Sequence, residues 1–352
     1  MSSKKTTKTA TAQGSLLDTF LTPALRAELG GKATPNGFRL ADVVKSGLEN
    51  PDSSIGVYAP DAEAYEVFKS LFHPVIAVYH GYNAEKDAHP RDFKVRASEL
   101  LPLDPEGRFI VSTRVRVGRN LKGFPLMPGI SREQLQEVEH LVLNALKALE
   151  GDLKGTYYPL PGMTKETRLA LVRNHFLFEG GREAFKEGDR FLESAGVTRN
   201  WPIGRGIFHS DSKNFLVWIN EEDQLRIISM EKGGNLFSVF ERLGRAIKTL
   251  EKRLAFVYSK HLGYFTSCPT NLGTAMRASV HAKLPRTSTR KDFKELCASL
   301  GLSVRGLHGE HTKSEGGIFD ISNKRRLGVS EAQIAKTLHA GVKKLIEMEQ
   351  KS

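Results

Sequence analysis

The chain has 352 residues, 39% hydrophobic and 26% charged, a composition typical of a globular protein with one to three domains, and no apolar run approaches the ~18 residues that a membrane helix needs. The two cysteines, Cys268 and Cys297, predict no disulfide framework and favour a reducing, cytoplasmic compartment. The formal net charge of +12 fits nucleic acid, a membrane surface or a polyanionic small substrate, and the positions of the basic residues must decide between these.

The N-terminal part of the sequence predicts a short tail followed by helices. Residues 1–14 are rich in Lys, Thr, Ala and Ser and lack an apolar stretch, so we expect a disordered tail rather than a signal or transit peptide. Within residues 15–90, leucine and phenylalanine recur at helical spacing, and Asp61 can cap one of the helices. We therefore expect a helical N-terminal domain here, and the polar segment 91–106 predicts a linker.

The remaining residues, 107–350, mix strand and helix patterns. Strand-like runs occupy 108–117, 214–220, 225–230 and 276–284, and helical patterns occupy 131–149, 237–254 and 330–349. Ser131 and Gln134 form a capping-box pattern, and Gly151 is expected to end that helix; Ser330 and Gln333 form a second capping box at the start of the last helix. We therefore expect an α+β fold, with a small all-helical N-terminal domain plus a larger C-terminal domain that has a mainly antiparallel β-sheet flanked by helices.

Several arginines lie inside the apolar strand patterns, which is unusual. With a period of two, Arg114 and Arg116 share one face of their strand, and Arg277 alternates with apolar residues in another. Arg226 and Arg305 lie in two further runs. Taken alone, an exposed sheet face with ordinary ion pairs explains Arg114 and Arg116 better than a binding site does. If all five point toward one place, their guanidinium groups form a strong polyanion site, because each can bind phosphate oxygens with two hydrogen bonds.

The glycine-rich signatures of common nucleotide-binding proteins are absent from the sequence. It contains no G-x-x-x-x-G-K-[ST] loop and no G-x-G-x-x-G fingerprint, and the H-R-D and D-F-G signatures of protein kinases are missing too. A nucleotide, if bound, would therefore be held by arginine side chains rather than by a glycine-rich loop.

Three other segments are ambiguous when each is taken alone. The acidic tip at 220–223 is most simply a solvated turn between two strands. Cys268, at the start of a turn with proline, asparagine and glycine, is either a buried thiol or a thiol that faces a cleft. The glycine-bearing segment 309–317 is either an ordinary surface loop or a lid.

Five motifs, in their order along the chain, resemble those of the phosphagen kinases, the ATP:guanidino phosphotransferases. They are STRVR at 112–116, VWINEED at 217–223, EKGG at 231–234, CPTNLGT with RASVH at 268–281, and ISNKRR at 321–326. The resemblance covers roughly residues 15–350. It makes the solvated turn and the inert buried thiol the less favoured interpretations of the two ambiguous segments.

The resemblance implies a reversible transfer of the ATP γ-phosphoryl group to a guanidino nitrogen, with Mg²⁺ held mainly by the nucleotide phosphates and no metal site in the protein itself. It implies that Glu222, Cys268 and Glu310 are catalytic residues that also contact the guanidino substrate. Nucleotide binding is implied for the five strand arginines and for residues near them or elsewhere in the motifs: Ser112, Thr113, Arg114, Val115, Arg116, His175, Arg226, Arg277, Ala278, Ser279, Val280, His281, Arg305, Gly306, Leu307, His308, Gly309 and Glu310.

The chemistry of guanidines supports these implied roles. A free guanidinium is a poor nucleophile because its pKa of about 12.5 or higher keeps it protonated. A carboxylate such as that of Glu222 can orient the guanidinium and take its proton as the new bond forms. Arginines and Mg²⁺ neutralise the charge of the transferred group. The resemblance also implies that Cys268 is a thiolate beside the guanidinium, stabilised by its arginine-rich, hydroxyl-bearing surroundings.

The expected substrate is L-arginine. The resemblance implies that Ser53, Ser54, Ile55 and Tyr58 contact the substrate from a short N-terminal loop. The length of this loop, Tyr58, and Tyr79 further along are similar to those of the arginine-using members of the family. Another guanidino compound, such as taurocyamine, is the close alternative.

Some positions depart from the family pattern. They are Ser54 in the substrate loop, Gln224 after the acidic tip, His308 in the glycine-bearing segment, and a seven-residue excess near 179–185. These departures bear on fine specificity and on the adenine side of the site, and they leave the reaction class unchanged.

Two further questions concern partners. A catalytically inactive protein that uses its positive charge to bind nucleic acid is less favoured, because the matched catalytic residues are all present. We therefore expect small-molecule partners only, with neither nucleic acid nor membrane. A monomer is expected, although Asp52 and Arg190 match a pair that is associated with domain contact in the family.

Overall fold

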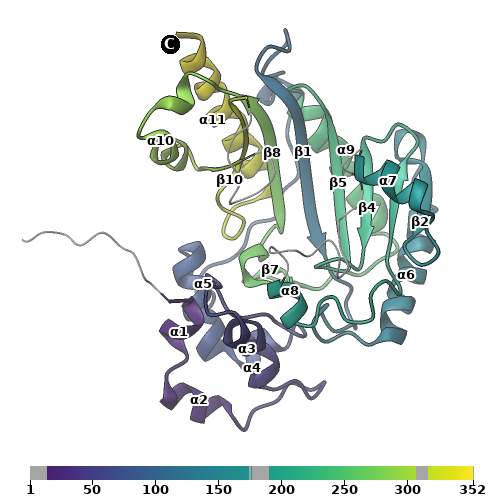
Figure 1. The fold of residues 1–352 in the computed structure, drawn as a ribbon, viewed down its shortest axis with the longest axis vertical. Coiled ribbons are helices and arrows are strands. Elements are labelled where there is room, and N and C mark those ends of the chain that lie inside the picture. Colours follow the sequence, from purple (N-terminus) through teal and green to yellow (C-terminus); the bar gives the residue numbers. More distant parts are fainter. Residues whose placement is uncertain (1–13, 174–175, 177–189, 307–315, 352) are drawn as a thin grey trace, which may run out of the picture.

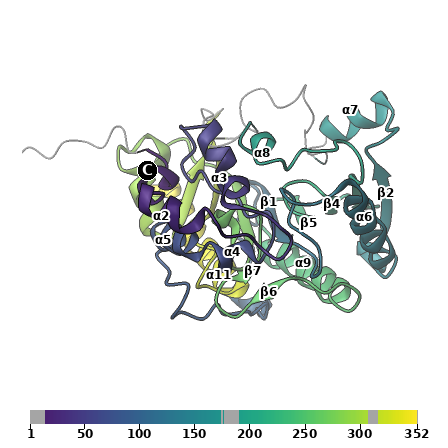
Figure 2. The same cartoon turned by 90° about the horizontal axis from the view of Figure 1, so that it is seen from below.

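The computed structural model describes residues 14–173, 176, 190–306 and 316–351, so the predicted tail lies, except for residue 14, outside the described residues (Figure 1). A small helical domain comes first and packs below a larger sheet domain. Its helices are α1 (Leu16–Phe20), α2 (Pro23–Leu29), α3 (Leu40–Glu49), α4 (Ala64–Val67) and α5 (Lys69–His80). Figure 2 shows these helices grouped together at one end of the molecule.

Local capping begins several of these helices. Ser15 forms a capping box with Asp18 at the start of α1, and the Thr22 side chain accepts a hydrogen bond from the backbone of Leu25 in α2. Asp61 accepts the backbone N–H of Ala64 at 2.8 Å, which agrees with its predicted capping role. The helical run after Asp61 is divided at Phe68, where α4 ends and α5 begins.

The core of the N-terminal domain includes residues from the other domain. Most of its buried side chains come from the helices just described, for example Leu71 and Phe72 of α5. Leu262, Leu272 and Leu327, far along the chain, belong to the same cluster and are almost fully buried. The two domains are therefore joined by a continuous apolar contact as well as by the chain between them, where the predicted linker segment 91–106 contains one short 3₁₀ turn, Ala97–Glu99.

An eight-stranded sheet forms the centre of the larger domain, and all its neighbouring strands are antiparallel. Its order is β2-β3-β4-β5-β1-β8-β10-β9. The strands are β1 (Ile110–Arg119), β2 (Gly155–Pro159), β3 (Gly206–Ser210), β4 (Phe215–Ile219), β5 (Leu225–Lys232), β8 (Met276–Lys283), β9 (Leu302–Arg305) and β10 (Ile318–Asn323), with a separate hairpin of β6 (Tyr258–Ser259) and β7 (Gly263–Tyr264). The predicted antiparallel sheet is confirmed.

Helices cover the sheet unequally. They are α6 (Arg132–Leu146), α7 (Lys165–Arg173), α8 (Arg190–Ser194), α9 (Leu236–Leu250), α10 (Phe293–Ser299) and α11 (Glu331–Lys351). The main core lies between one face of the sheet and α6, α9 and α11, and a smaller apolar cluster near α7 lies on the other face. Within the described part of the chain, no helix combines the length and the apolar character that a membrane crossing requires.

Two predicted caps have the expected geometry, and one predicted end is wrong. Ser131 and Gln134 form a capping box at α6, and Ser330 with Gln333 caps α11 in the same way. However, α6 ends at Leu146 and not at Gly151. The backbone after Leu146 tightens into hydrogen bonds between residues three apart, and Gly151, with φ +59°, starts a separate 3₁₀ turn.

Candidate active site

The register of the sheet brings the strand arginines onto one face. Arg116 of β1 lies directly opposite Arg277 of β8. On the other side of β1, Gly118 pairs with Arg226 of β5. Across β10, Asp320 pairs with both His281 of β8 and Arg305 of β9. Since directly opposed residues share a face of a sheet, all five predicted arginines lie on the face away from α9 and α11.

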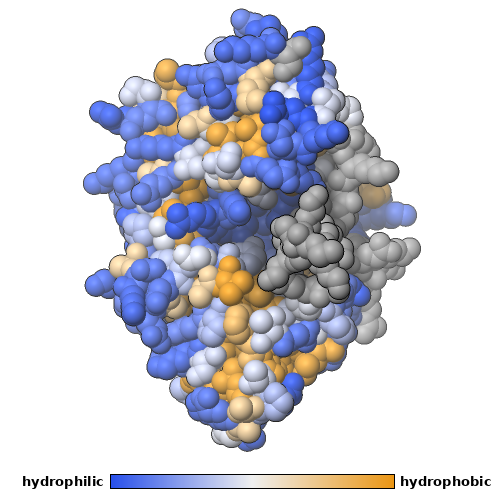
Figure 3. All heavy atoms as spheres, turned by 90° about the vertical axis from the view of Figure 1, so that its left-hand side faces the viewer, coloured by the Kyte–Doolittle hydropathy of each residue, from blue (hydrophilic) through white to orange (hydrophobic). Residues whose placement is uncertain are grey.

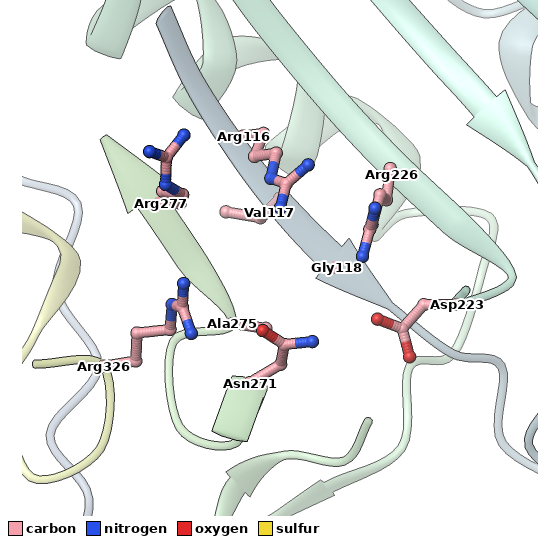
Figure 4. A pocket seen from close by; sticks show the side chains of 9 residues that line it. All are labelled: Arg116, Val117, Gly118, Asp223, Arg226, Asn271, Ala275, Arg277 and Arg326. Carbon is pink, nitrogen blue, oxygen red and sulfur yellow. The ribbon is translucent and has the colours of Figure 1, made fainter. Parts of the chain in front are cut away.

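A pocket opens over the ends of these strands. Its lining residues are Arg116, Val117, Gly118, Asp223, Arg226, Asn271, Ala275, Arg277 and Arg326. Figure 4 shows Arg277, Arg116 and Arg226 along one side of it, and Arg326, Asn271 and Asp223 along the other. A hollow with hydrophilic walls is also visible at mid-height of the face drawn in Figure 3, between the N-terminal helices and the sheet domain.

Arg326 was not among the predicted site residues. It belongs to the ISNKRR motif, but it follows β10 in a loop, where no alternation of polar and apolar residues reveals its direction. The motif itself was the only available signal. Trp218 was missed in the same way: it pairs with Arg226 across the sheet, and the Arg114 guanidinium lies 5.4 Å from its ring centre.

The arginines repel one another at close range. The pKa of Arg114 is lowered to about 10, chiefly by burial and then by the charges of Arg277 and Arg226. For Arg116, burial is again the largest cause, and three neighbouring arginines help to hold its pKa well below the ordinary value. A site that stores several like charges out of water favours a polyanion, because the anion relieves both the repulsion and the desolvation.

Carboxylates neutralise part of this charge. Arg277 donates to Asp320 at 2.6 Å. Arg226 forms ion pairs with Glu221, at 2.7 Å, and with Glu222. Although burial by itself lowers the pKa of Arg226, these carboxylates raise it above its ordinary value. Arg226 therefore joins the arginine cluster to the acidic tip.

The acidic tip is a hydrogen-bonded corner with Asn220 and Asp223 buried and the two glutamates between them half-buried, rather than a solvated turn. Asn220, with φ +56°, donates from its side chain to the carbonyls of Leu135 and Gly204. Asp223 is 1% exposed and accepts a hydrogen bond from Asn120 at 2.8 Å. Burial, followed by the charge of Glu222, raises the pKa of Asp223 to about 6. Gln224, one of the departures from the family pattern, is buried and holds the backbone of Leu121 and Pro125.

Cys268 precedes a 3₁₀ turn, Pro269–Asn271, at the edge of the same pocket. Its Sγ lies 3.1 Å from the Thr270 hydroxyl, and the side chain of Asn271 donates to Glu222 at 3.0 Å. Burial, followed by the charge of Glu222, raises the pKa of the thiol to about 12. In the protein without substrate, desolvation and the neighbouring carboxylate therefore outweigh the hydrogen bond from Thr270 and favour the neutral thiol, and the thiolate expected beside a bound guanidinium stays a prediction.

The predicted substrate loop lies against the segment that carries Cys268. The backbone N–H of Ala59 donates to the carbonyl of Ser267 at 2.8 Å. Tyr58 is buried in the same core cluster as Cys268. Within the loop, Ser53 accepts from the N–H of Gly56, and the carbonyls of Ser54 and Ile55 accept from the first residues of α1. Gly56 also packs closely on Gly47 of α3. A Cβ atom added at Gly47 would lie 2.3 Å from the carbonyl oxygen of Gly56.

The other predicted nucleotide-binding residues fall into three groups. Ser112 and His281 lie on the arginine face, with their side chains 3.2 Å apart, and Ser279 pairs with Arg114 there. The side chains of Val115, Ala278 and Val280 belong to the opposite, helix-covered core, and Thr113 donates to the carbonyl of Gly233. Gly306, at the end of β9, is buried.

Several predictions lie outside the described residues: His175, Leu307, His308, Gly309 and Glu310, most of the segment 309–317, and the excess near 179–185. Beside them, two features are described. Trp218 donates its indole N–H to the carbonyl of Phe176 at 2.7 Å. Arg190 forms an ion pair with Asp52, across the two domains.

The small helical domain is docked on an antiparallel sheet that carries an arginine cluster beside carboxylates and a cysteine. This arrangement is suited to a polyanion placed next to a cationic group. Comparison with known proteins identifies the family. The C-terminal catalytic domain of ATP:guanido phosphotransferases matches residues 137–352, and the N-terminal domain of the same proteins matches residues 11–77.

Relatives match almost the whole chain. The arginine kinases Lit v 2 of Penaeus vannamei and Scy s 2 of Scylla serrata are 50% and 49% identical over 346 residues, which is 98% of this chain and 95% of each relative. A solved lombricine kinase has a TM-score of 0.89 at 39% identity, covering 96% of this chain and 92% of its own. The chain belongs to the ATP:guanido phosphotransferase family.

A longer relative is also similar. The substrate-free duplicated taurocyamine kinase of Schistosoma mansoni has a TM-score of 0.88 at 44% identity. The match covers 96% of this chain but 47% of that chain, so the present chain spans about half the length of the duplicated kinase.

Proposed function

We propose that this chain transfers the γ-phosphoryl group of ATP reversibly to a guanidino nitrogen of L-arginine, giving phosphoarginine and ADP as an energy buffer. One observation carries the proposal: the arginine cluster and the acidic tip meet at the turn that follows Cys268, joined by the ion pairs of Arg226 with Glu221 and Glu222. The identity of about half of all residues to arginine kinases supports arginine as the acceptor.

The arginine cluster is proposed to bind the nucleotide phosphates. Two carboxylates pair with Arg226, and no comparable pair of carboxylates surrounds the other arginines of the cluster, Arg114, Arg116, Arg277 and Arg326. Burial lowers the pKa of three of these, Arg114, Arg116 and Arg326. Phosphate oxygens would replace this repulsion by charge-assisted hydrogen bonds. Since phosphoryl transfer depends mainly on alignment and on charge neutralisation, a rigid sheet is a suitable support for the clamp.

Glu222 is the proposed base. It lies between Arg226, with which it forms an ion pair, and Asn271, whose amide donates to it at 3.0 Å. A guanidinium bound beside Cys268 would meet this carboxylate, which can hold the planar group and accept its proton as the N–P bond forms. The substrate loop, with Ser53 to Tyr58, lies on the N-terminal side of the same turn and would hold the amino-acid end of the substrate.

Mg²⁺ is proposed to enter with the nucleotide, held mainly by its phosphates, where it neutralises charge on the transferred group. Among the residues that the structure describes, no group of three or more His, Cys, Asp or Glu side chains is arranged to hold a metal ion. Of the carboxylates at the pocket, Asp223 is buried and accepts a hydrogen bond from Asn120, and the neighbouring Glu221 and Glu222 pair with Arg226. The donor set therefore fits a metal that keeps its own phosphate and water ligands.

The remaining expectations are part of the same proposal. We propose a helical substrate domain at residues 15–90 and a catalytic domain at 107–350, with the segment 91–106 between them. Both cysteines are free, which fits action in the reducing cytoplasm. A monomer is proposed, since the pocket and the substrate loop are both supplied by one chain.

The test is a coupled assay of ADP release with a panel of acceptors: L-arginine, taurocyamine, lombricine, creatine and glycocyamine. We expect the highest kcat/KM with L-arginine, and ADP release should depend on both Mg²⁺ and the acceptor. Faster turnover of taurocyamine than of arginine would overturn the assignment of arginine as the substrate, but the reaction class would stand. ADP release without phosphorylation of any guanidino acceptor would overturn the reaction class as well.

A further inference from the structure

The last residue of α5 reaches into the catalytic domain. Nε2 of His80 lies 2.8 Å from the backbone carbonyl oxygen of Pro269. Pro269 directly follows Cys268 and is the first residue of the 3₁₀ turn. A side chain of the N-terminal domain therefore contacts the turn that carries the cysteine of the proposed site.

The direction of this hydrogen bond follows from its acceptor. A carbonyl oxygen cannot donate, so Nε2 of His80 must carry the hydrogen, whether the ring is neutral or protonated. The ring is half-buried at the end of α5, and Gly81 follows it in the left-handed conformation, with φ +62°. The bond is thus a fixed property of the fold and does not depend on the titration of His80.

Each residue of the turn has its own side-chain anchor. His80 holds the carbonyl of Pro269, Arg326 donates to the carbonyl of Thr270 at 2.9 Å, and Asn271 donates to Glu222 at 3.0 Å. The three anchors come from different places: the N-terminal domain, the arginine cluster and the acidic tip. The turn is therefore in direct contact with the N-terminal domain, the arginine cluster and the acidic tip.

We propose that His80 is a positioning residue, which fixes the Cys268 turn relative to Glu222 and couples the substrate domain to the catalytic groups. The inference deepens the proposed function and rests on it for the roles of Cys268 and Glu222. The geometry of the turn itself does not depend on which guanidino compound is the substrate.

Docking of the N-terminal domain does not rest on His80 alone. Tyr65 donates to the carbonyl of Thr266 at 2.9 Å, and Ala59 donates to that of Ser267 at 2.8 Å. Leu272 also lies in the N-terminal core. Loss of the His80 bond should therefore free the turn locally while the two domains stay in contact.

The chain offers a matched control. His73 lies on the same helix, two turns before His80, is also half-buried, and faces Glu85 with Nδ1 3.4 Å from its carboxylate. The test compares His80→Ala, His80→Gln and His73→Ala. A glutamine amide N–H can take the place of the Nε2 hydrogen, so His80→Gln asks whether the hydrogen bond rather than the ring is required.

Two measurements are made on each variant: steady-state kinetics, and the rate at which iodoacetamide alkylates Cys268 in the absence of substrates, followed by mass spectrometry with Cys297 as the internal reference. For His80→Ala we expect a loss of about tenfold or more in kcat, with a smaller change in KM for ATP, because a displaced catalytic turn misaligns the reacting groups. Alkylation of Cys268 should be about threefold or more faster, because the loosened turn exposes the thiol. His80→Gln should recover most of both effects, and His73→Ala should resemble the wild type.

Three outcomes would overturn the proposal. One is an unchanged kcat and alkylation rate in His80→Ala. Another is His80→Gln being as impaired as His80→Ala, with an equal fall in Tm, since the ring would then serve packing only. The third is an equal effect of His73→Ala. If wild-type protein fails to phosphorylate any guanidino acceptor while His80→Ala still alters Cys268 alkylation, the proposed function fails and the positioning of the turn stands.

Discussion

The two faces of the central sheet are built from the same strands but have opposite roles. One face is packed against the core, and the other carries the arginine cluster. On one face, Val115 and Val117 of β1 are completely buried against the core that α9 helps to form. On the other, Arg114 and Arg116 of the same strand crowd against further arginines. Each residue of β1 is thus assigned to one face by the alternation of the strand.

The difference between these faces is energetic. Burial of a valine side chain stabilises the fold by about 1.5–3 kcal/mol, and the helix-covered face gathers many such contributions. The arginine face removes positive charges from water and brings them together, which destabilises the folded protein until an anion arrives. Packing on the helix-covered face stabilises the folded sheet. This stability offsets the repulsion between the arginines on the other face, which no anion neutralises when the site is empty.

The largest expected effect on turnover is that of Glu222→Gln. The substitution keeps the shape and removes the charge that would orient and deprotonate the guanidinium, so we expect kcat to fall by about 10²- to 10⁴-fold. Binding of ADP, measured by calorimetry, should change little because the proposed phosphate clamp is intact. A kcat like that of the wild type would remove Glu222 from the chemistry.

Replacing one arginine of the clamp should separate activity from stability. Arg116→Met keeps much of the apolar stem and removes one charge from the cluster, and we expect kcat/KM for ATP to fall by about 10²-fold or more. In the same variant, Tm should rise, because burial and three neighbouring arginines hold the pKa of Arg116 well below its ordinary value. Lys248→Met, which removes an exposed charge from α9, is the control and should change neither. A lower Tm in Arg116→Met would contradict the repulsion argument.

The pH dependence of Cys268 is the next test. Burial and Glu222 raise the pKa of this thiol to about 12, and a raised pKa leaves little thiolate at neutral pH. Without substrate, its alkylation rate should therefore increase about tenfold for each pH unit from pH 7 to 10, with no plateau in that range. Glu222→Gln removes one cause of the shift and should speed alkylation at any given pH. If the alkylation rate instead reached a plateau near pH 8, Cys268 would be a thiolate near neutral pH even without substrate, as the sequence motif suggested.

Local features were the most predictable part of the fold. The caps at Ser131 and Ser330 and the hairpin of β4 and β5 depend on neighbours in sequence, and all three are present. Alternation also assigned Arg114 and Arg116 correctly to one face of a strand. It could not say which strands lie side by side, so convergence of the arginines required the register of β1 with β8 and β5.

The errors and omissions have a common physical origin. Arg326 was missed because its neighbours in the pocket, such as Arg116, are distant in sequence, and Trp218 because the Arg114 guanidinium over its ring comes from a strand that lies far away in the sequence. The raised pKa of the Cys268 thiol in the protein without substrate was not predicted, because burial depends on tertiary packing, which motif similarity does not express. The role inferred for His80 likewise depends on a contact between residues 189 positions apart. Residue types could be matched to chemistry from sequence, whereas distances and desolvation could not.

The smallest expected effect on turnover is that of Leu243→Ala, on the helix-covered face. Leu243 is fully buried in α9, which packs on β1 and β5, so its truncation should lower the free energy of unfolding by about 2–5 kcal/mol, measured by urea denaturation. Leu141→Ala, at a 37% exposed position in α6, is the control and should cost less than about 1 kcal/mol. Well below the midpoint of unfolding, however, kcat of Leu243→Ala should stay within about twofold of the wild type, since the cavity is separated from the arginine face by the sheet itself and the two sites share no partner. A folded Leu243→Ala with a kcat as low as that of Arg116→Met would mean that packing behind β1 sets the positions of the arginines in front of it, and the two faces would then have to be treated as one mechanical unit.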